Sequence, residues 1–129
     1  MKYLPLLLAG FLVSCSTEEA PSNVTENLDG QALMKHHCYS CHNTQGTSNM
    51  LAPPMSRVKD HYYSEGVSRK TFIEAIVKWV ENPNEETSVM PGALRKFGLM
   101  PKQNFDKQDV EAIAAYLYDS NLEQEGCNH

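Results

Sequence analysis

Apolar residues recur at helical spacing in four stretches of the chain, and no stretch alternates apolar and polar residues as a half-buried strand does. The predicted helices run from Gly30 to about Cys41, from Met55 to Tyr63, from Ser68 to Glu81 and from Asp106 to about Asp119. The second of these is the shortest. The pattern therefore predicts an all-α fold, with three main helices plus a shorter one.

Polar residues mark where the three main helices begin. Asp29, Ser68 and Asp106 are the predicted N-caps, because their side-chain oxygens can accept hydrogen bonds from the first free backbone N–H groups. Pro83 ends the helix before it, since proline disfavours helical backbone for the preceding residue. The expected buried faces comprise Leu33, Met34 and Cys38, then Phe72, Ile73, Ile76, Val77, Trp79 and Val80, and finally Val110, Ile113, Ala114 and Leu117.

The amino end has the proportions of an export signal. Lys2 precedes an apolar run from Tyr3 to Val13, which is shorter than the roughly 20 residues of a membrane-spanning helix. The run ends in Leu-Val-Ser-Cys, and it resembles a bacterial lipoprotein signal in which Cys15 is lipidated and the preceding peptide is removed. A plain secretory peptide with an incidental cysteine is the alternative.

These features divide the chain into four segments. Residues 1–14 are the predicted signal peptide, and residues 15–27 are the lipidated cysteine with a flexible tether rich in Pro, Ser, Thr and Glu. Residues 28–120 form the predicted domain, and residues 121–129 form a polar tail. The expected location is outside the cytoplasm, anchored to a membrane and facing the periplasm or outer side.

Length and charge limit the classes of function. A chain of 129 residues allows one domain and excludes a two-domain enzyme. It has 11 Lys and Arg against 16 Asp and Glu, so its formal charge is −5; loss of residues 1–14 removes one lysine and leaves 10 against 16, or −6. Because no Lys/Arg cluster forms a basic stripe, nucleic acid is not an expected partner.

The sequence Cys38-Tyr39-Ser40-Cys41-His42 is the most specific motif in the chain. In C-x-x-C-H motifs the two thiols add to the vinyl groups of a haem, and the following histidine ligates the iron. A thioredoxin-like redox pair would need a βαβ context, and a zinc site would need a second ligand pair, but Cys127 is the only later cysteine. The motif therefore predicts one covalently bound haem c, and export supports it because bacteria attach haem outside the cytoplasm.

An electron-carrying haem needs a second iron ligand. A methionine thioether raises the reduction potential and leaves no open coordination position. Met34 lies on the motif's own helix, and Met50 and Met55 are close to His42 in sequence, so these three reach the opposite haem face less readily. Met90 and Met100 are each followed by proline in the loop expected before the last helix, and either could approach from the other side.

Taken together, these elements resemble class I c-type cytochromes of the monohaem, bacterial, lipoprotein-anchored kind, over roughly residues 28 to 120. Gly30 stands where the family has a small residue that lets the last helix cross closely. Ile113 and Tyr116 match an aliphatic-aromatic pair on that helix. Pro53 or Pro54 stands where a proline carbonyl accepts a hydrogen bond from the ligating histidine, and Met100-Pro101 matches the ligand loop.

The resemblance implies roles for individual residues. Cys38 and Cys41 would bind the haem, with His42 and Met100 as axial ligands and Met90 as the alternative to Met100. Other roles are suggested by the residues themselves. The indole of Trp79 could donate to a haem propionate or simply pack in the core, and Met90 and Phe97 could line the haem pocket or pack without contact with the haem. His61 is the best alternative nitrogen ligand, although a loop-packing role is expected for it. His36 and His37 are expected to be exposed, and Cys127 is expected to be a free thiol.

The expected function is a membrane-tethered electron carrier between respiratory-chain proteins, not an enzyme, and monomeric. The net negative charge suggests redox partners with a basic docking patch. A haem protein with a labile sixth ligand, acting in ligand sensing or small-molecule redox catalysis, is one alternative. A fixed electron-transfer subunit of an oxidoreductase complex is another.

Overall fold

The computed structural model describes residues 28–43 and 50–122, and it contains no strand within these ranges. The elements are α1 (Gly30–His37), α2 (Met55–Tyr62), α3 (Arg69–Glu81), the 3₁₀ turn η1 (Glu85–Thr87), α4 (Pro91–Phe97) and α5 (Lys107–Asp119). The predicted all-α class is confirmed. The predicted signal, tether and lipidation site at Cys15 lie outside the described residues, as does Cys127.

The three main helices begin where their polar caps predict. The Asp29 carboxylate accepts hydrogen bonds from the backbone N–H groups of Gln31 and Ala32 at 3.0 and 3.1 Å. The Ser68 hydroxyl accepts from the backbone of Thr71 at 3.1 Å, and Asp106 accepts from that of Gln108 at 3.1 Å. Each cap satisfies N–H groups that the helix itself leaves without partners.

The first helix is shorter than predicted, because α1 ends at His37 and not at Cys41. The Met34 carbonyl accepts from the backbone N–H of Cys38 at 2.9 Å and also from that of Tyr39 at 3.3 Å, and this wider bond ends the α-helical pattern. The C-x-x-C-H motif therefore forms a separate turn, which the N–H of His42 closes on the Cys38 carbonyl at 2.8 Å.

A second difference is α4, in a segment predicted to be a loop. Pro91 is its first residue and Gly98 follows its last, with a φ of 81° that favours glycine. Proline at the start and glycine just past the end are known helix signals. The helix is only seven residues long, however, so no apolar period could reveal it in the sequence.

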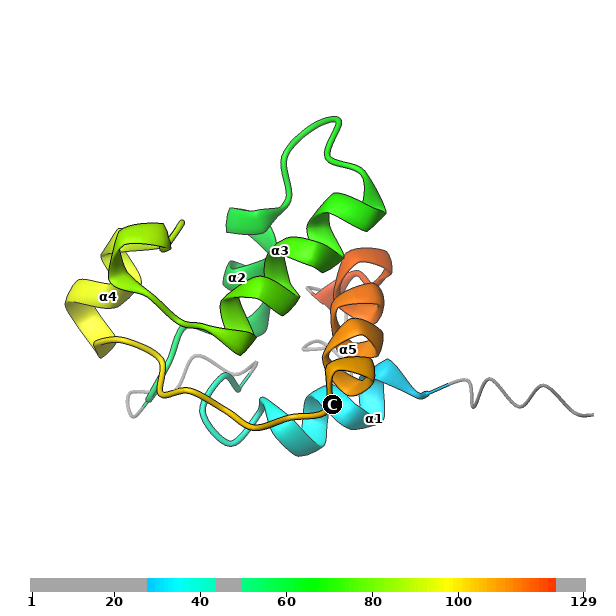
Figure 1. Cartoon of the computed structure of the whole chain (residues 1–129), viewed down its shortest axis with the longest axis horizontal. Coiled ribbons are helices and arrows are strands. Elements are labelled where there is room, and N and C mark those ends of the chain that lie inside the picture. Colours follow the sequence, from blue (N-terminus) through cyan, green and yellow to red (C-terminus); the bar gives the residue numbers. More distant parts are fainter. Residues whose placement is uncertain (1–27, 44–49, 123–129) are drawn as a thin grey trace, which may run out of the picture.

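Helices α1, α3 and α5 form one packed group, with α5 between the other two, and α4 lies at the opposite side of the molecule (Figure 1). The crossing of α1 and α5 is close at Gly30. A Cβ atom there would lie 2.3 Å from the Ala112 carbonyl oxygen and 2.7 Å from the Tyr116 Cβ. The predicted need for a small residue at this crossing is confirmed.

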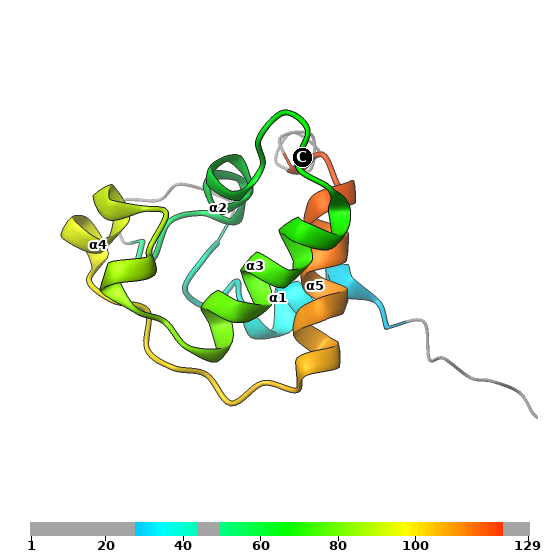
Figure 2. The same ribbon diagram turned by 45° about the horizontal axis from the view of Figure 1, so that its top comes forward.

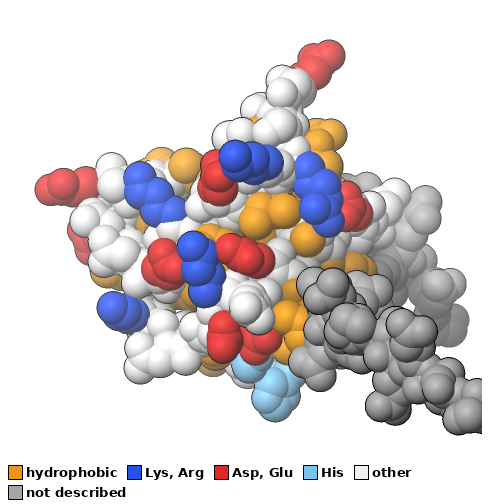
Figure 3. All heavy atoms as spheres, turned by 45° about the vertical axis from the view of Figure 1, so that its right-hand side comes forward, with side chains coloured by type: hydrophobic (Ala, Val, Ile, Leu, Met, Phe, Trp, Pro, Cys, Tyr) orange, Lys and Arg blue, Asp and Glu red, His pale blue; other side chains and the backbone are white. Residues whose placement is uncertain are grey.

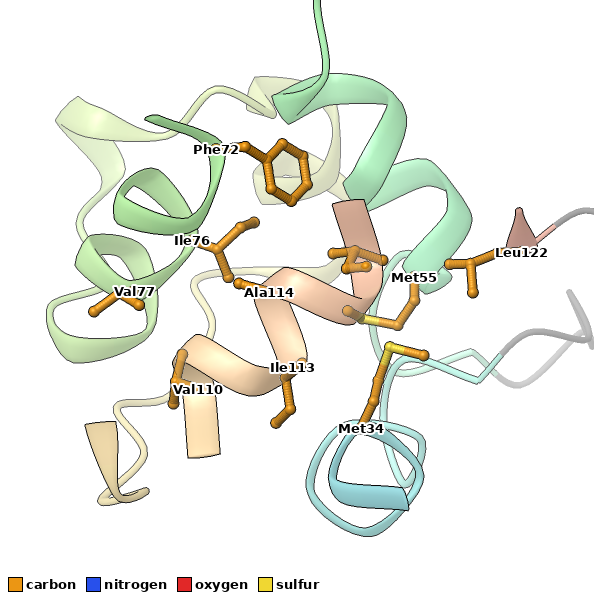
Figure 4. Packing of buried hydrophobic residues seen from close by; sticks show 10 residues of the cluster. Met34, Met55, Phe72, Ile76, Val77, Val110, Ile113, Ala114 and Leu122 are labelled. Carbon is orange, nitrogen blue, oxygen red and sulfur yellow. The ribbon is translucent and has the colours of Figure 1, made fainter. Parts of the chain in front are cut away.

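The core lies between these helices, and Figure 4 shows how its side chains converge from α1, α2, α3 and α5. Met34, Phe72, Ala114 and Leu117 are completely buried, so the expectation that Met34 packs is confirmed. The buried apolar residues are Met34, Met55, Phe72, Ile76, Val77, Val110, Ile113, Ala114, Leu117 and Leu122.

Polar contacts tie the end of α5 to α2, to α3 and to the chain that joins them, and Figure 2 shows that connection between α2 and α3. The ammonium of Lys59 donates to the carbonyls of Tyr118, at 2.9 Å, and Ser120. The Tyr118 hydroxyl donates to the Val67 carbonyl at 3.2 Å. Arg69 forms a two-pronged pair with Asp119. The two Lys59 bonds use carbonyls that the C-terminal end of α5 leaves free.

The surface carries charges of both signs. On the face in Figure 3, Lys and Arg side chains alternate with Asp and Glu side chains and form no single-sign stripe. No helix within residues 28–43 and 50–122 is long and apolar enough to cross a membrane.

Candidate functional site

A cavity of about 350 Å³ lies between the end of α1, α2, α3, α4 and the segment that leads into α5. Its lining is largely apolar. Four residues of the buried core, Met55, Ile76, Val110 and Ile113, form part of it, so the cavity opens directly onto the core. An apolar chamber of this kind suits a large, flat, mainly hydrophobic ligand.

The C-x-x-C-H turn forms one wall of this cavity, and Cys38, Cys41 and His42 all line it. Both cysteines are free thiols; Cys38 is half-buried and Cys41 is exposed. Burial raises the pKa of Cys38 to about 11, so its thiol is protonated at neutral pH. Two unpaired thiols beside an apolar cavity are therefore available to bind covalently to a ligand in it.

His42 is held by the chain that follows the motif. Its Nδ1 lies 2.7 Å from the Pro53 carbonyl oxygen, which makes Nδ1–H the donor and leaves Nε2 for a metal. Burial lowers the pKa of His42, although the bond to Pro53 acts in the opposite direction. A lowered pKa favours the neutral imidazole, which is the form that ligates metals.

Both methionines that precede a proline reach this cavity. Met90, at the N-cap of α4, and Met100, three residues beyond α4, line it together with Phe97. Among the other described methionines, Met55 is a buried member of the lining, whereas Met34 and Met50 are not part of it. The structure therefore brings together the two predicted alternatives for the second ligand without choosing between them.

Trp79 and Pro53 also line the cavity. The alternative ligand His61 does not. It is exposed on α2, where its Nδ1 lies 2.8 Å from the Arg57 carbonyl oxygen of its own helix. A role for His61 in the site is therefore not supported, and it belongs to the outer surface of α2.

The prediction that His37 is exposed is wrong. His37 is half-buried, lines the cavity and lies 3.4 Å from a carboxylate oxygen of Asp109, whereas its neighbour His36 is exposed. Ala93 and Leu94 of α4 also line the cavity, although neither was predicted to do so. The Pro91 and Gly98 signals could have located them, since they define the helix that turns both side chains inward.

A family model described as cytochrome c matches residues 28–120 of the chain. The chain belongs to the cytochrome c family. A cytochrome c6-like protein of Nostoc sp. (strain PCC 7120) is 27% identical over 116 residues, which is 90% of each chain. No solved structure matches the chain.

Members of this family bind haem c covalently, and the cavity of this cytochrome c is suited to that group. Its thiols, the Nε2 atom of His42 and a mainly apolar wall face the same space. The size of the domain suits one haem. The predicted class I c-type cytochrome and its single covalent haem c are therefore confirmed, and the protein is a haem c electron-transfer protein.

Proposed function

We propose that this cytochrome c carries single electrons between proteins of a bacterial respiratory chain and is not itself an enzyme. The observation that carries the proposal is that one apolar cavity is lined by two free cysteines, by His42 with its Nε2 available, and by Met90 and Met100. When bound, haem c supplies an iron that alternates between two oxidation states. The residues of the chain bind it, orient it and exclude water from it.

In this proposal the thiols of Cys38 and Cys41 attach the haem, and His42 is the axial ligand on one side. The Pro53 carbonyl orients the His42 ring, since a bonded Nδ1–H fixes the tautomer and raises the basicity of Nε2. Met100 is the proposed second ligand, with Met90 as the alternative. Trp79, from α3, is the proposed donor to a haem propionate.

Filling both axial positions is what separates a carrier from a catalyst or a sensor. With a thioether as the sixth ligand, no coordination position is open to substrate, and the reduced state is favoured. The oxidised protein should then be low-spin and show the near-infrared band of sulfur bound to iron. A high-spin spectrum with ready CO binding would instead indicate ligand sensing or small-molecule redox catalysis.

The rim of the cavity is the proposed contact surface for redox partners. Among the described residues, Leu51, Val89 and Leu99 are large apolar side chains that are at least two-fifths exposed; Leu51 and Leu99 line the cavity, and Val89 lies between two lining residues. Exposed apolar side chains gathered at one site indicate an interaction surface. The net charge of −6 after removal of residues 1–14 favours partners with a basic docking patch, through long-range attraction.

The proposal places the protein outside the cytoplasm, lipidated at Cys15 and tethered to a membrane by residues 16–27. The tether would keep the carrier close to membrane-bound partners and raise its effective concentration there. Treatment with a signal-peptidase inhibitor, or the variant Cys15→Ala, should give a precursor that retains residues 1–14, which its mass would show. A stable complex that survives purification in mild detergent would identify a fixed subunit in place of a mobile carrier.

The deciding experiment is a pyridine haemochrome assay and mass measurement on protein matured in a host that attaches haem c. One haem per chain is expected, with both vinyl groups converted. Met100→Ala and Met90→Ala are the matched pair for the axial ligand: only Met100→Ala should lose the sulfur–iron band. Retention of that band in Met100→Ala, together with its loss in Met90→Ala, would assign the ligand to Met90.

A further inference from the structure

His37 occupies an unusual position for an ionisable residue. It is the last residue of α1, directly precedes Cys38, and lines the same cavity as Cys38, Cys41 and His42. Its side chain is only 19% exposed. A charge on this imidazole would therefore lie close to the haem, in surroundings that screen it less than bulk water does.

Three elements hold the His37 ring. From α5, an Asp109 carboxylate oxygen lies 3.4 Å from Nε2, and the Asp109 side chain is 26% exposed. From the segment between α4 and α5, the Phe105 ring centre lies 4.6 Å from that of His37, and Phe105 also lines the cavity. From α1 itself, the exposed His36 ring makes an edge contact at 4.8 Å.

One charged group lies against the His37 ring, the carboxylate of Asp109. Asp109 lies in the first turn of α5, where the helix dipole stabilises a carboxylate, and that carboxylate in turn stabilises an imidazolium. Asp106 is engaged as the N-cap of α5, through its bond to Gln108. Cys38, His42 and Tyr62 are the other ionisable residues of the cavity lining with His37, apart from the exposed Cys41.

We propose that His37 and Asp109 form a proton-binding site coupled to the haem, so that reduction of the protein is accompanied by uptake of one proton at His37. This inference rests on the proposed function, because it requires a haem in the cavity. One electron from a donor removes one positive charge at the iron, and one proton from water adds to the His37 ring. Nε2 faces Asp109, so the added proton binds at Nδ1.

The coupling is electrostatic. Before reduction, the positive charge at the iron disfavours an imidazolium on the cavity wall; after reduction this repulsion is smaller. Histidine is the side chain that changes charge in the physiological pH range, so the reduction potential would depend on pH within that range. The potential of the carrier would then fall as pH rises, and electron delivery would respond to the proton concentration outside the membrane.

The test is the midpoint potential of the haem-loaded protein between about pH 5 and 9 for wild type, His37→Gln and Asp109→Asn. Wild type should bind the proton about tenfold more tightly when reduced, which corresponds to a total change of about 59 mV. His37→Gln should lose this pH dependence. Asp109→Asn should keep it but move it to lower pH, because the imidazolium loses its carboxylate.

His61→Gln is the matched control, since His61 is exposed and does not line the cavity. It should behave as wild type. A potential that depends on pH equally in wild type and His37→Gln would assign the effect to the haem propionates and overturn the proposal. A pH-independent wild type would overturn it as well.

Direct proton uptake gives a second readout that needs no variant. Reduction of wild type in weakly buffered solution with a pH indicator should consume at most about half a proton per haem, at a pH midway between the midpoints of the two oxidation states, and none well above both midpoints. The NMR titration of the His37 ring should differ between the two oxidation states. A low-spin, methionine-ligated protein that fails these tests contradicts only this inference, whereas a protein without haem or with an open sixth position contradicts the proposed function.

Discussion

The helical core and the wall of the cavity are built on different principles. The core of α1, α3 and α5 contains nearly all of the buried residues, and its helices pack directly on one another. The segment from Asn82 to Asp109, which includes α4, contains no buried residue, although Met90, Leu94, Phe97 and Met100 face the cavity. Contacts among its own side chains stabilise the core, whereas the cavity wall is stabilised by contacts with the group that fills the cavity.

The difference between the two regions explains how a helix as short as α4 can be stable. Seven residues are too few for a stable isolated helix, and no residue of α4 is fully buried; Ala93, Leu94 and Phe97 are half-buried. Its apolar residues point to the space where haem c binds. For this region the haem takes the place of a protein core. Without haem, the wall should therefore lose more of its structure than the core of α1, α3 and α5.

Removal of the haem should produce the largest effect, because it takes away the packing partner of the wall. In Cys38→Ser/Cys41→Ser, backbone amides of residues 90–106 should exchange hydrogen at nearly the rate of an unfolded chain, while α3 and α5 keep residual protection. Overall stability should also fall, since Met55, Ile76, Val110 and Ile113 line both the core and the cavity. Hydrogen exchange followed by mass spectrometry measures this.

Protection of residues 90–106 as strong in the double variant as in the haem-bound protein would contradict the distinction between core and wall. His61→Gln provides a matched control with full haem content, because His61 lies outside the cavity.

Gly30→Ala should be the most damaging single change within the core. The new Cβ would lie 2.3 Å from the Ala112 carbonyl oxygen, so α1 and α5 must separate. Overpacking of this kind destabilises proteins by about 1–3 kcal/mol. Denaturant unfolding of the haem-bound protein measures the loss.

The same substitution in the wall should do no harm. At Gly92, in α4, an added Cβ would meet only the end of the Arg95 side chain, at 3.9 Å. Alanine is favoured over glycine within a helix by up to about 1 kcal/mol, so Gly92→Ala should be neutral or slightly stabilising. Equal destabilisation by Gly30→Ala and Gly92→Ala would show that the α1–α5 crossing is no more sensitive to an added Cβ than α4 is.

Tyr62 connects the two regions, and its effect depends on pH. It lines the cavity, and burial raises its pKa to about 12. An unfolded chain ionises tyrosine near pH 10, whereas the folded protein keeps this phenol protonated up to about pH 12. Stability linked to Tyr62 is therefore complete below about pH 10 and is lost as the pH rises towards 12.

Tyr62→Phe should be less sensitive than wild type to a change from about pH 9 to pH 11 in denaturant unfolding. Tyr63→Phe is the matched control, because Tyr63 is the next residue and its side chain is 47% exposed. If wild type and Tyr62→Phe lose the same stability over this range, burial of Tyr62 is not what controls the alkaline limit.

The smallest expected effect is at the surface of the core. Arg69 and Asp119 join α3 to the end of α5 at 2.9 Å, but both side chains are more than half exposed. Exposed ion pairs contribute at most about 1 kcal/mol. Arg69→Ala should therefore lower the free energy of unfolding by less than Gly30→Ala does, and added salt should reduce the difference.

Lys70→Ala is a control on the next residue, since Lys70 is 85% exposed and 3.8 Å from Glu74 on its own helix. Its effect should be close to zero. A double-mutant cycle on Arg69 and Asp119 isolates the pair itself, and a coupling energy larger than the effect of Gly30→Ala would show that this contact, not the helix crossing, secures α5.

The sequence by itself determined the helices of the core, the attachment motif and the family. Caps at Asp29, Ser68 and Asp106, and apolar residues at helical spacing, are local signals that keep their meaning wherever the helix lies. The spacing of Cys38, Cys41 and His42 is also local, because one turn brings the three side chains to one side of the cavity.

Only the tertiary structure decided which distant residues share the cavity with that motif. His37 could not be recognised as part of the site because its partners, Phe105 and Asp109, are about 70 positions away in the sequence and reach it through the packing of α5 on α1. The sequence marks the two ends of α4 at Pro91 and Gly98, but that its apolar residues face the cavity is visible only in the tertiary structure. Contacts between residues far apart in the sequence give no periodic pattern. They depend on where the helices cross in space, whereas caps and apolar spacing depend only on neighbouring residues.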